Sequence, residues 1–486
     1  NGRKSGLILS LFILLFSSYG HFAEILRRTG FSLPWIGRNA VILLIPAGAI
    51  VFIVCTYFII RSRSDFADIT RILNLATAFL VIVPAFRIAS YEMNLTPLRQ
   101  MPAAREGPIL KIHSPAVTRN IYYIILDAHG RSDVLKELYD YDDTPMISHL
   151  KDKGFFVASR SRTNYFCTLY SLASSLGFDY LDTSDRAYKR GDWIDTKDMI
   201  AYSKVSKILK DVGYRFVSFD EGGEVQNADF SMNPWKRSEF ADQLLRTTAA
   251  VSVSNIADRK RREVLYPFEC LPATADAPYP VFVFAHIMAP HRPFVFAADG
   301  SDPGCWGRPG TPTTNRVSET DGISRPEHIE HYRQQIAYVD ALLVKTVDAI
   351  LAKSRIPPII VIQGDHGPEA YLNPLDINGT YFNERMSILN AYYLPDGGDA
   401  LLYDDITPVN TFRLIFNYYF GADCPMLADE SFFAPPESLS SLANVTDMID
   451  NDDDRKRLEM LRSMDYFPPC TSPAVAATDS NLPARD

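Results

Sequence analysis

Three long apolar segments stand in the first 93 residues and set this part of the chain apart from the rest. They cover residues 6–22, 41–60 and 72–86. The second is a run of twenty residues without a charge, which is long enough to cross the hydrocarbon core of a bilayer. We therefore predict that residues 1–93 form a membrane anchor of about three transmembrane helices. A signal peptide over the first segment, or buried helices of a soluble core, are the alternatives.

Basic residues around these segments predict their orientation. Arg3 and Lys4 precede the first segment, and arginines at positions 61, 63 and 71 lie between the second and the third. Lys and Arg concentrate on the cytoplasmic side of a membrane, so the third segment would deliver the remaining chain to the other side. Three arginines between the first and second segments oppose this orientation. Because the chain begins with Asn1 rather than Met, we also expect the anchor to be truncated at its N-terminus.

Beyond residue 93, short apolar runs alternate with segments of helical spacing. Residues 94–119 are polar and contain several prolines, which is typical of a linker. A domain over 120–470 follows, and residues 471–486 are predicted to be disordered. Strands are predicted at 120–126, 155–158, 214–219, 280–286, 358–363 and 387–394, helices at 132–138, 145–153, 205–211, 327–352 and 407–416, and a loop at 225–235. This alternation predicts an α/β fold in which a mostly parallel sheet is sandwiched by helices.

Residues that can bind a metal follow three of the predicted strands. Asp127 follows the first, His286 ends the strand at 280–286, and Asp365 and His366 follow the strand at 358–363 within Gly-Asp-His-Gly. The carboxyl ends of parallel strands meet at one edge of a sheet, where ligands bind. Carboxylate and imidazole groups are ligands for divalent metals such as zinc or manganese. A polar turn after a strand is the alternative for each residue alone.

A hydroxyl group lies at the start of another predicted helix. Leucines at 169, 172 and 176 recur at helical spacing, which places Thr168 at the N-terminus, where unpaired N–H groups favour an anion. A metal at the strand ends would make this hydroxyl a nucleophile toward a phosphate or sulfate ester. His291, and with it His286, would contact the phosphoryl oxygens or protonate the leaving group. A helix cap is the alternative role of Thr168.

Charge and cysteine content narrow the setting. The net charge is −9 and no basic stripe is present, which argues against nucleic acid as a partner. Of six cysteines, one lies in an apolar segment and Cys167 lies beside Thr168. The other four predict disulfides in an exported domain. Three pairings are possible, and proximity in sequence favours Cys270–Cys305 and Cys424–Cys470.

The order of these features resembles the alkaline phosphatase superfamily. A strand ending in a carboxylate, a hydroxyl at a helix start, a His-x4-His pair and a Gly-Asp-His-Gly segment follow one another over roughly residues 120–395. They are similar to the sulfatase-like members, above all to the membrane-anchored lipoteichoic acid synthases and phosphoethanolamine transferases. The resemblance implies a divalent metal: zinc or manganese, or else calcium or magnesium. It implies the metal ligands Asp127, Thr168, Asp365 and His366, with Thr168 as nucleophile, and the substrate-binding residues His291, His286 and Asn164.

Two departures from the family pattern are informative. Arylsulfatases convert the first residue of Cys/Ser-x-Pro-x-Arg to formylglycine, whereas Cys167 is followed by Thr-Leu-Tyr-Ser, without the Pro and the Arg. This argues against arylsulfatase activity. Asp127 stands where lipoteichoic acid synthases have Glu, but either carboxylate can bind a metal.

The resemblance implies a metal-dependent enzyme of the bacterial inner (cytoplasmic) membrane, with its catalytic domain on the periplasmic or extracellular side. We expect it to transfer phosphoglycerol or phosphoethanolamine from a lipid to a cell-envelope acceptor such as a glycan, with the membrane as its other partner. A phosphodiesterase or sulfuric ester hydrolase, with water as acceptor, would use the same site. A non-catalytic envelope protein with a degenerate hydrolase fold is the third alternative, and the intact set of site residues argues against it.

Overall fold

The structure is a computed structural model, and it divides into two compact units. One comprises residues 1–110 and 237–254, and the other residues 111–236 and 255–486. The described residues are 2–28, 43–64, 66–75, 77–79, 82–83, 86, 110, 112–115, 117–181, 193–220, 225–234, 247–248, 256–303, 324–434 and 442–463. Most of the predicted linker and the whole predicted tail lie outside these ranges, as do Cys305 and Cys470. The domain boundaries and the two disulfides therefore stay predictions.

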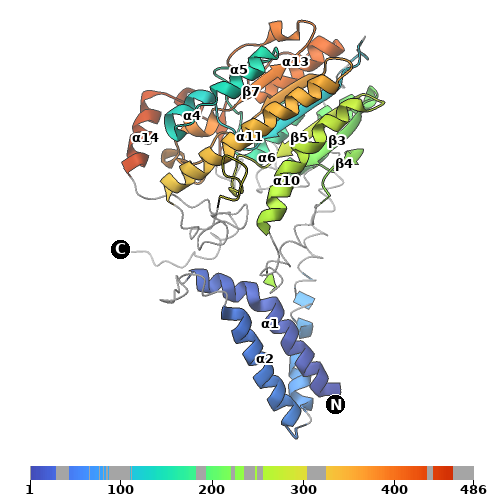
Figure 1. The fold of residues 1–486 in the computed structure, drawn as a ribbon, viewed down its shortest axis with the longest axis vertical. Coiled ribbons are helices and arrows are strands. Elements are labelled where there is room, and N and C mark those ends of the chain that lie inside the picture. Colours follow the sequence, from blue (N-terminus) through green and yellow to red (C-terminus); the bar gives the residue numbers. More distant parts are fainter. Residues whose placement is uncertain are drawn as a thin grey trace. The chain divides into compact units, whose positions relative to one another are not determined.

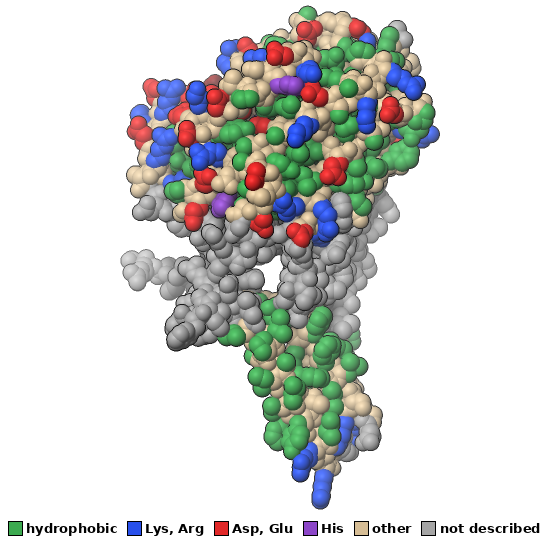
Figure 2. Space-filling view, in the orientation of Figure 1, with side chains coloured by type: hydrophobic (Ala, Val, Ile, Leu, Met, Phe, Trp, Pro, Cys, Tyr) green, Lys and Arg blue, Asp and Glu red, His purple; other side chains and the backbone are tan. Residues whose placement is uncertain are grey.

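The first unit contains two long apolar helices, α1 (Gly2–Arg28) and α2 (Leu44–Arg61), which pack against each other. Both are long and apolar enough to cross a membrane. No residue of α2 is buried, and large apolar side chains such as Phe12, Ile53 and Phe58 are exposed. Hydrophobic side chains dominate the surface of these helices (Figure 2). They are possible membrane spans. The third predicted segment, 72–86, is only partly described, and its described residues are helical and exposed.

A seven-stranded sheet forms the centre of the second unit (Figure 1). The strand order is β2-β7-β6-β1-β5-β3-β4, and only β7 runs antiparallel to its neighbours. All six residues of β1 are buried, as expected for an apolar run in the middle of a parallel sheet. The strands are β1 (Ile121–Leu126), β2 (Phe156–Val157), β3 (Arg215–Asp220), β4 (Phe230–Ser231), β5 (Val281–Ile287), β6 (Ile359–Gln363) and β7 (Asn390–Tyr393).

Helices cover both faces of this sheet. On one face, side chains of α5, α10 and α11 form the main core with alternate strand residues such as Ile124 and Val283, and Figure 1 shows α11 crossing in front of the strands. On the other face, Tyr123 packs edge-on against Phe412 of α13, with ring centroids 5.2 Å apart. The helices on the first face are α4 (Ser132–Tyr139), α5 (Thr144–Asp152), α10 (Ile256–Cys270) and α11 (Arg325–Lys353). Those on the second face are α6 (Thr168–Gly177), α7 (Trp193–Ala201), α8 (Lys204–Asp211) and α13 (Pro408–Phe420).

Short elements complete the unit. Among them α14 carries two buried leucines, Leu458 and Leu461, which pack in a second apolar cluster with residues of α4 and α11. The elements are α12 (Phe382–Met386), α14 (Asp452–Ser463), the strands β8 (Phe432–Phe433) and β9 (Ala443–Asn444), and the 3-10 turns η4 (Leu271–Asp276), η5 (Ile377–Gly379), η6 (Gly398–Leu401) and η8 (Thr446–Met448).

The α/β class predicted from the sequence is confirmed, with differences in detail. The predicted strand at 387–394 is shorter, because Ser387 and Ile388 make isolated bridges to Arg162 and Gly130 instead of joining β7. The helices α7 and α10 were not predicted. In α10 a charged stretch and the internal Pro267 hide the apolar spacing. The loop predicted at 225–235 contains the two-residue strand β4.

Candidate active site

Neighbouring parallel strands bring the predicted site residues to one edge of the sheet. β6, β1 and β5 are adjacent. Asp127 follows β1, and His286 lies near the end of β5. Side chains alternate between the two faces of a strand, so Asp127 is in step with Tyr123, and His286 with Phe282. Both aromatic rings pack on the face that α13 covers, and the polar side chains are thereby directed to this face.

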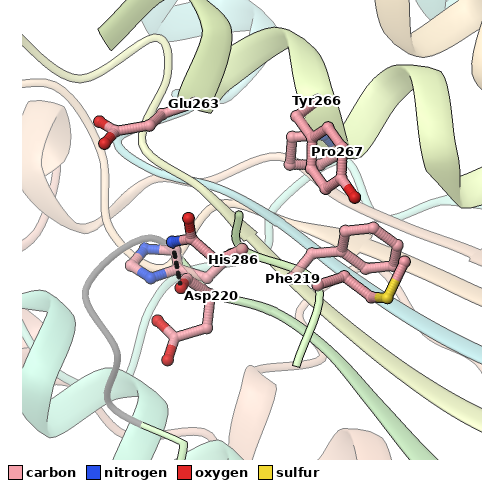
Figure 3. A pocket seen from close by; sticks show the side chains of 8 residues that line it. Phe219, Asp220, Glu263, Tyr266, Pro267 and His286 are labelled. Atoms are coloured by element: carbon pink, nitrogen blue, oxygen red, sulfur yellow. Dashed lines mark hydrogen bonds between the residues drawn. The ribbon is translucent and has the colours of Figure 1, made fainter. Parts of the chain in front are cut away.

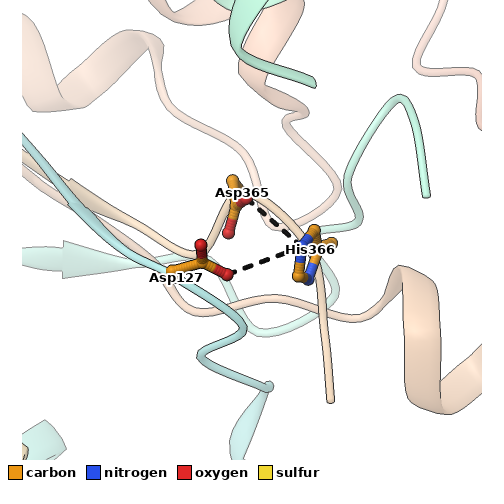
Figure 4. A group of neighbouring side chains, drawn as sticks. All are labelled: Asp127, Asp365 and His366. Atoms are coloured by element: carbon orange, nitrogen blue, oxygen red, sulfur yellow. Dashed lines mark ion pairs between the residues drawn. The ribbon is translucent and has the colours of Figure 1, made fainter. Parts of the chain in front are cut away.

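Asp127, Asp365 and His366 form a buried cluster (Figure 4). Nε2 of His366 lies 3.5 Å from Oδ1 of Asp127 and 3.4 Å from Oδ2 of Asp365. One ligand atom from each residue lies within 4.8 Å of the others, and none of the three residues is more than 2% exposed. Two carboxylates and an imidazole therefore converge on one small, enclosed space.

The bonding of this cluster fits a cation. Among the described residues, Oδ1 of Asp127 and Oδ2 of Asp365 have no hydrogen-bond partner. Nδ1 of His366 lies 3.0 Å from the carbonyl oxygen of Gly367, so this nitrogen carries the proton and Nε2 presents a lone pair. Burial, helped by the charge of Arg385, lowers the pKa of His366 to about 3. Buried carboxylates facing a lone pair need a positive partner, and these donors suit a divalent metal such as zinc or manganese.

Glycines on both sides of Asp365 and His366 allow the chain to pass very close to other backbone. A Cβ on Gly364 would lie 2.4 Å from the carbonyl oxygen of His129, and one on Gly367 would lie 2.0 Å from that of Glu384. No side chain fits at either position without a shift of the backbone. The Gly-Asp-His-Gly segment therefore packs directly against the backbone of two other segments, at His129 and at Glu384.

Thr168 is the first residue of α6, as predicted, and it lies beside the cluster. Its Oγ1 is 3.1 Å from Nε2 of His366. Cys167, the residue just before the helix, is not a member of the converging group. Burial raises the pKa of the Cys167 thiol to about 12, so this thiol stays protonated at neutral pH. The structure thus brings the hydroxyl, rather than the thiol, to the cluster of Asp127, Asp365 and His366.

The two predicted substrate histidines lie near the same cluster. Nε2 of His286 is 3.3 Å from Oδ2 of Asp127. The backbone N–H of His291 donates to the carbonyl oxygen of Asp127 at 2.9 Å, and the ring centroids of His291 and His366 are 6.1 Å apart. The loop that carries His291 has cis peptide bonds before both of its prolines. Contact of either histidine with substrate stays a prediction.

Asn164 is buried and is bonded to the start of α13. Its Nδ2 donates to Oγ1 of Thr407 and to the carbonyl oxygen of Glu430, both at 2.9 Å, and its Oδ1 accepts from the N–H of Val409 at 2.9 Å. The residue is 1% exposed. These bonds hold the start of α13 in the interior, and contact of Asn164 with substrate stays a prediction.

Three buried charged groups near the cluster were missed by the sequence analysis. Nε of Arg292 lies 2.6 Å from Oε1 of Glu369. Burial alone would raise the pKa of Glu369, but the charges of Arg292, His291, Arg385 and His328 together outweigh it and hold that pKa well below its usual range. Nε2 of His129 lies 2.8 Å from Oδ1 of Asp340, and Arg385 is the third group. Each contact joins segments that are far apart in sequence, so no local pattern marks these residues.

A small pocket adjoins the cluster on the side of β3 and β5 (Figure 3). His286 lines it from β5, Asp220 from the end of β3 and Glu263 from α10. Its volume of about 10 Å³ is close to the minimum for one water molecule. The pocket is thus too small for a lipid headgroup. Its lining residue His286 also contacts Asp127 of the cluster.

Comparison with known proteins places this site in a family. The family model described as Sulfatase matches residues 119–412, which is more than half of the chain, and the chain therefore belongs to the sulfatase family. This match confirms the resemblance to the sulfatase-like alkaline phosphatase superfamily. No curated protein matches the chain.

The chain is similar in fold to several solved structures, including these two. The C-terminal periplasmic domain of EcEptC from Escherichia coli, in complex with zinc, is 14% identical over 71% of this chain and 97% of that chain, with a TM-score of 0.46. The integral membrane protein lipooligosaccharide phosphoethanolamine transferase A (EptA) from Neisseria meningitidis is 12% identical over 80% of this chain and 71% of that chain, with a TM-score of 0.42.

Proposed function

We propose that the chain is a metal-dependent, membrane-anchored transferase that moves phosphoglycerol or phosphoethanolamine from a phospholipid to a cell-envelope acceptor through Thr168. The observation that carries this proposal is the position of the Thr168 hydroxyl, 3.1 Å from His366 and beside two buried carboxylates that lack hydrogen-bond partners among the described residues. Membership of the sulfatase family supports ester chemistry at this site.

The residues of the chain divide the reaction between them. Asp127, Asp365, His366 and Thr168 would hold a divalent metal, zinc or manganese, or else calcium or magnesium, which lowers the pKa of a hydroxyl and offsets the charge of an ester when bound. Oγ1 of Thr168 gives its proton to solvent and forms a bond to phosphorus, and the bond from phosphorus to the lipid oxygen breaks. His291 would give the lipid oxygen its proton. The acceptor hydroxyl then attacks phosphorus and gives its proton to His291, while the bond from phosphorus to Oγ1 of Thr168 breaks.

Water as the acceptor gives the second candidate, a phosphodiesterase or sulfuric ester hydrolase. The same residues would serve, and only the group that attacks the Thr168 adduct differs. The two apolar helices of the first unit favour lipid as the donor and the bacterial inner membrane as the location. The catalytic unit then faces the periplasm or the exterior, where a lipid or an envelope glycan can reach it.

Product analysis with labelled phospholipid tests the proposal. Elemental analysis of the purified chain comes first, and we expect at least one divalent metal per chain. The chain is then incubated with membranes whose phosphoethanolamine or phosphoglycerol headgroup carries the label. Label on a glycan or lipid acceptor supports transfer, and label free in solution supports hydrolysis. If metal is bound but the label stays on the phospholipid, both reactions are ruled out.

A further inference from the structure

Arg385 joins the two segments that carry the reactive residues. It lies in α12, and only 4% of its surface is exposed. Its Nε donates to the carbonyl oxygen of Phe166 at 2.6 Å, two residues before Thr168. Its Nη1 donates to the carbonyl oxygen of Gly367 at 2.9 Å, directly after His366. The guanidinium group therefore lies between the start of α6 and the Gly-Asp-His-Gly segment.

This buried cation lacks a carboxylate partner among the described residues. The glutamates nearby make their hydrogen bonds elsewhere: Glu369 pairs with Arg292, and the carboxylate of Glu384 accepts from the backbone N–H groups of Ala370 and Tyr371. Arg385 interacts with both glutamates electrostatically, without a hydrogen bond to either. Nη2 of Arg385 makes no hydrogen bond to a described residue. Buried charges are normally paired, so a guanidinium group whose hydrogen bonds to described residues go to two carbonyl oxygens has donors left for an anion.

The neighbourhood of Arg385 suits a tetrahedral oxyanion. The N-terminus of α6 presents backbone N–H groups that favour negative charge. A guanidinium group offers several donors in a fixed plane, which match the oxygens of a phosphate or sulfate group. Asp127 and Asp365, by contrast, would repel an anion, so a positive group on the Thr168 side favours anion binding in addition to the proposed metal.

We propose that Arg385 is the anion-binding residue of this site, and that its guanidinium group contacts the non-bridging oxygens of the phosphate or sulfate ester that Thr168 attacks. This inference rests on the proposed function for the role of Thr168, but binding of the anion itself does not depend on turnover.

The chain offers a matched control in Arg413 of α13. This arginine is also buried and also donates to two backbone carbonyl oxygens, those of Phe178 at 2.8 Å and Pro425 at 2.7 Å. It lies 3.7 Å from the carboxylate of Asp179. Replacing Arg413 therefore removes a similar set of structural bonds without removing a charge from the site.

Calorimetric titration of the full chain, purified in detergent and loaded with zinc, measures the binding of inorganic phosphate and, separately, of sulfate. We expect Arg385→Gln to lower the affinity for the preferred anion by about tenfold or more. Arg385→Lys should lower this affinity less, because the charge is kept. Arg413→Gln should stay within about twofold of the unchanged chain. Zinc content should be the same in all variants. Preference for phosphate over sulfate, or the reverse, identifies the ester class.

An equal loss of affinity in Arg385→Gln and Arg413→Gln, or no loss in Arg385→Gln, would overturn the inference. If Arg385→Gln does not fold, a crystal structure of the unchanged chain with tungstate decides, since tungstate bound at Thr168 without a contact to Arg385 also overturns it. The proposed function can fail independently: anion binding through Arg385 without turnover of labelled lipid would contradict the function only, whereas unchanged turnover in Arg385→Gln would contradict only the role of Arg385.

Discussion

Two adjacent residues, Cys167 and Thr168, show how strongly the immediate surroundings decide chemical role. The thiol is the stronger nucleophile in principle, but burial keeps it protonated, and it lies outside the converging group. The hydroxyl reaches Nε2 of His366. Consecutive side chains point in different directions, so only one of the two can face the cluster.

Thr168→Ala should lower turnover of labelled phospholipid by about 10³-fold or more, because the nucleophile is lost. Metal content, measured by elemental analysis, should remain near that of the unchanged chain, since three of the four proposed ligands are intact. Cys167→Ala serves as the control and should keep most of the activity. A covalent substrate adduct mapped to Cys167 would contradict the assignment.

Asp127→Asn should change stability in opposite directions with and without metal. In a chelator, the asparagine removes one of two buried negative charges and can donate to Nε2 of His366, so the free energy of unfolding should rise by about 1 kcal/mol. With zinc present, the loss of a ligand should lower it. Thermal unfolding in both conditions checks this, and a decrease in both would show that Asp127 is needed for packing rather than for a metal.

The sequence marks some site residues and leaves others unmarked for a physical reason. Asp127, Asp365 and Thr168 stand where a strand ends or a helix begins, and hydrophobic spacing reveals these points. Arg385 and Glu369 have no such signal, because their roles arise from contacts with segments that lie elsewhere in the chain. Local patterns therefore predict the centre of the site but not the charges around it.

At the scale of elements, the close passage of the Gly-Asp-His-Gly segment is the feature that fixes the site. Strands and helices with clear apolar spacing, such as β1, β6 and α11, were predicted near their observed bounds. The helix α10 was not, because tertiary packing of a few residues such as Val264 and Phe268 stabilises a segment in which seven of fifteen residues are charged. The wedged glycines could be recognised only once the neighbouring backbone was known.

Gly367→Ala should destabilise the fold by about 1–3 kcal/mol and weaken zinc binding, because its Cβ would lie 2.0 Å from the carbonyl oxygen of Glu384 and the resulting shift moves His366. Gly177→Ala is the matched control. There the added Cβ would meet only Cε of Met199, at 3.7 Å, so little change is expected. Chemical denaturation and zinc titration measure both effects, and equal stability of the two variants would contradict the prediction.

On the scale of the whole molecule, the two units differ in the surfaces they present. The first exposes apolar helices. Figure 2 shows positive and negative side chains interspersed over the visible face of the second. A core with helices on both sides of the sheet gives the second unit its own means of folding.

A shortened chain that begins at residue 111, and so keeps residues 237–254 of the first unit, should therefore be soluble without detergent and should bind zinc. Size-exclusion chromatography and circular dichroism in the presence of metal check this expectation. Aggregation of the shortened chain at every metal concentration tested would show that the second unit depends on residues 1–110.

The borders of the sheet have a consequence for behaviour at high concentration. The outermost strands, β2 and β4, contain two residues each, whereas the three central strands contain five to seven. Within the described residues, a border this short offers few free N–H and C=O groups to which the strand of another molecule could add. Crowding should therefore leave copies of this domain separate, because fibril growth by edge-to-edge pairing has almost no template from which to start.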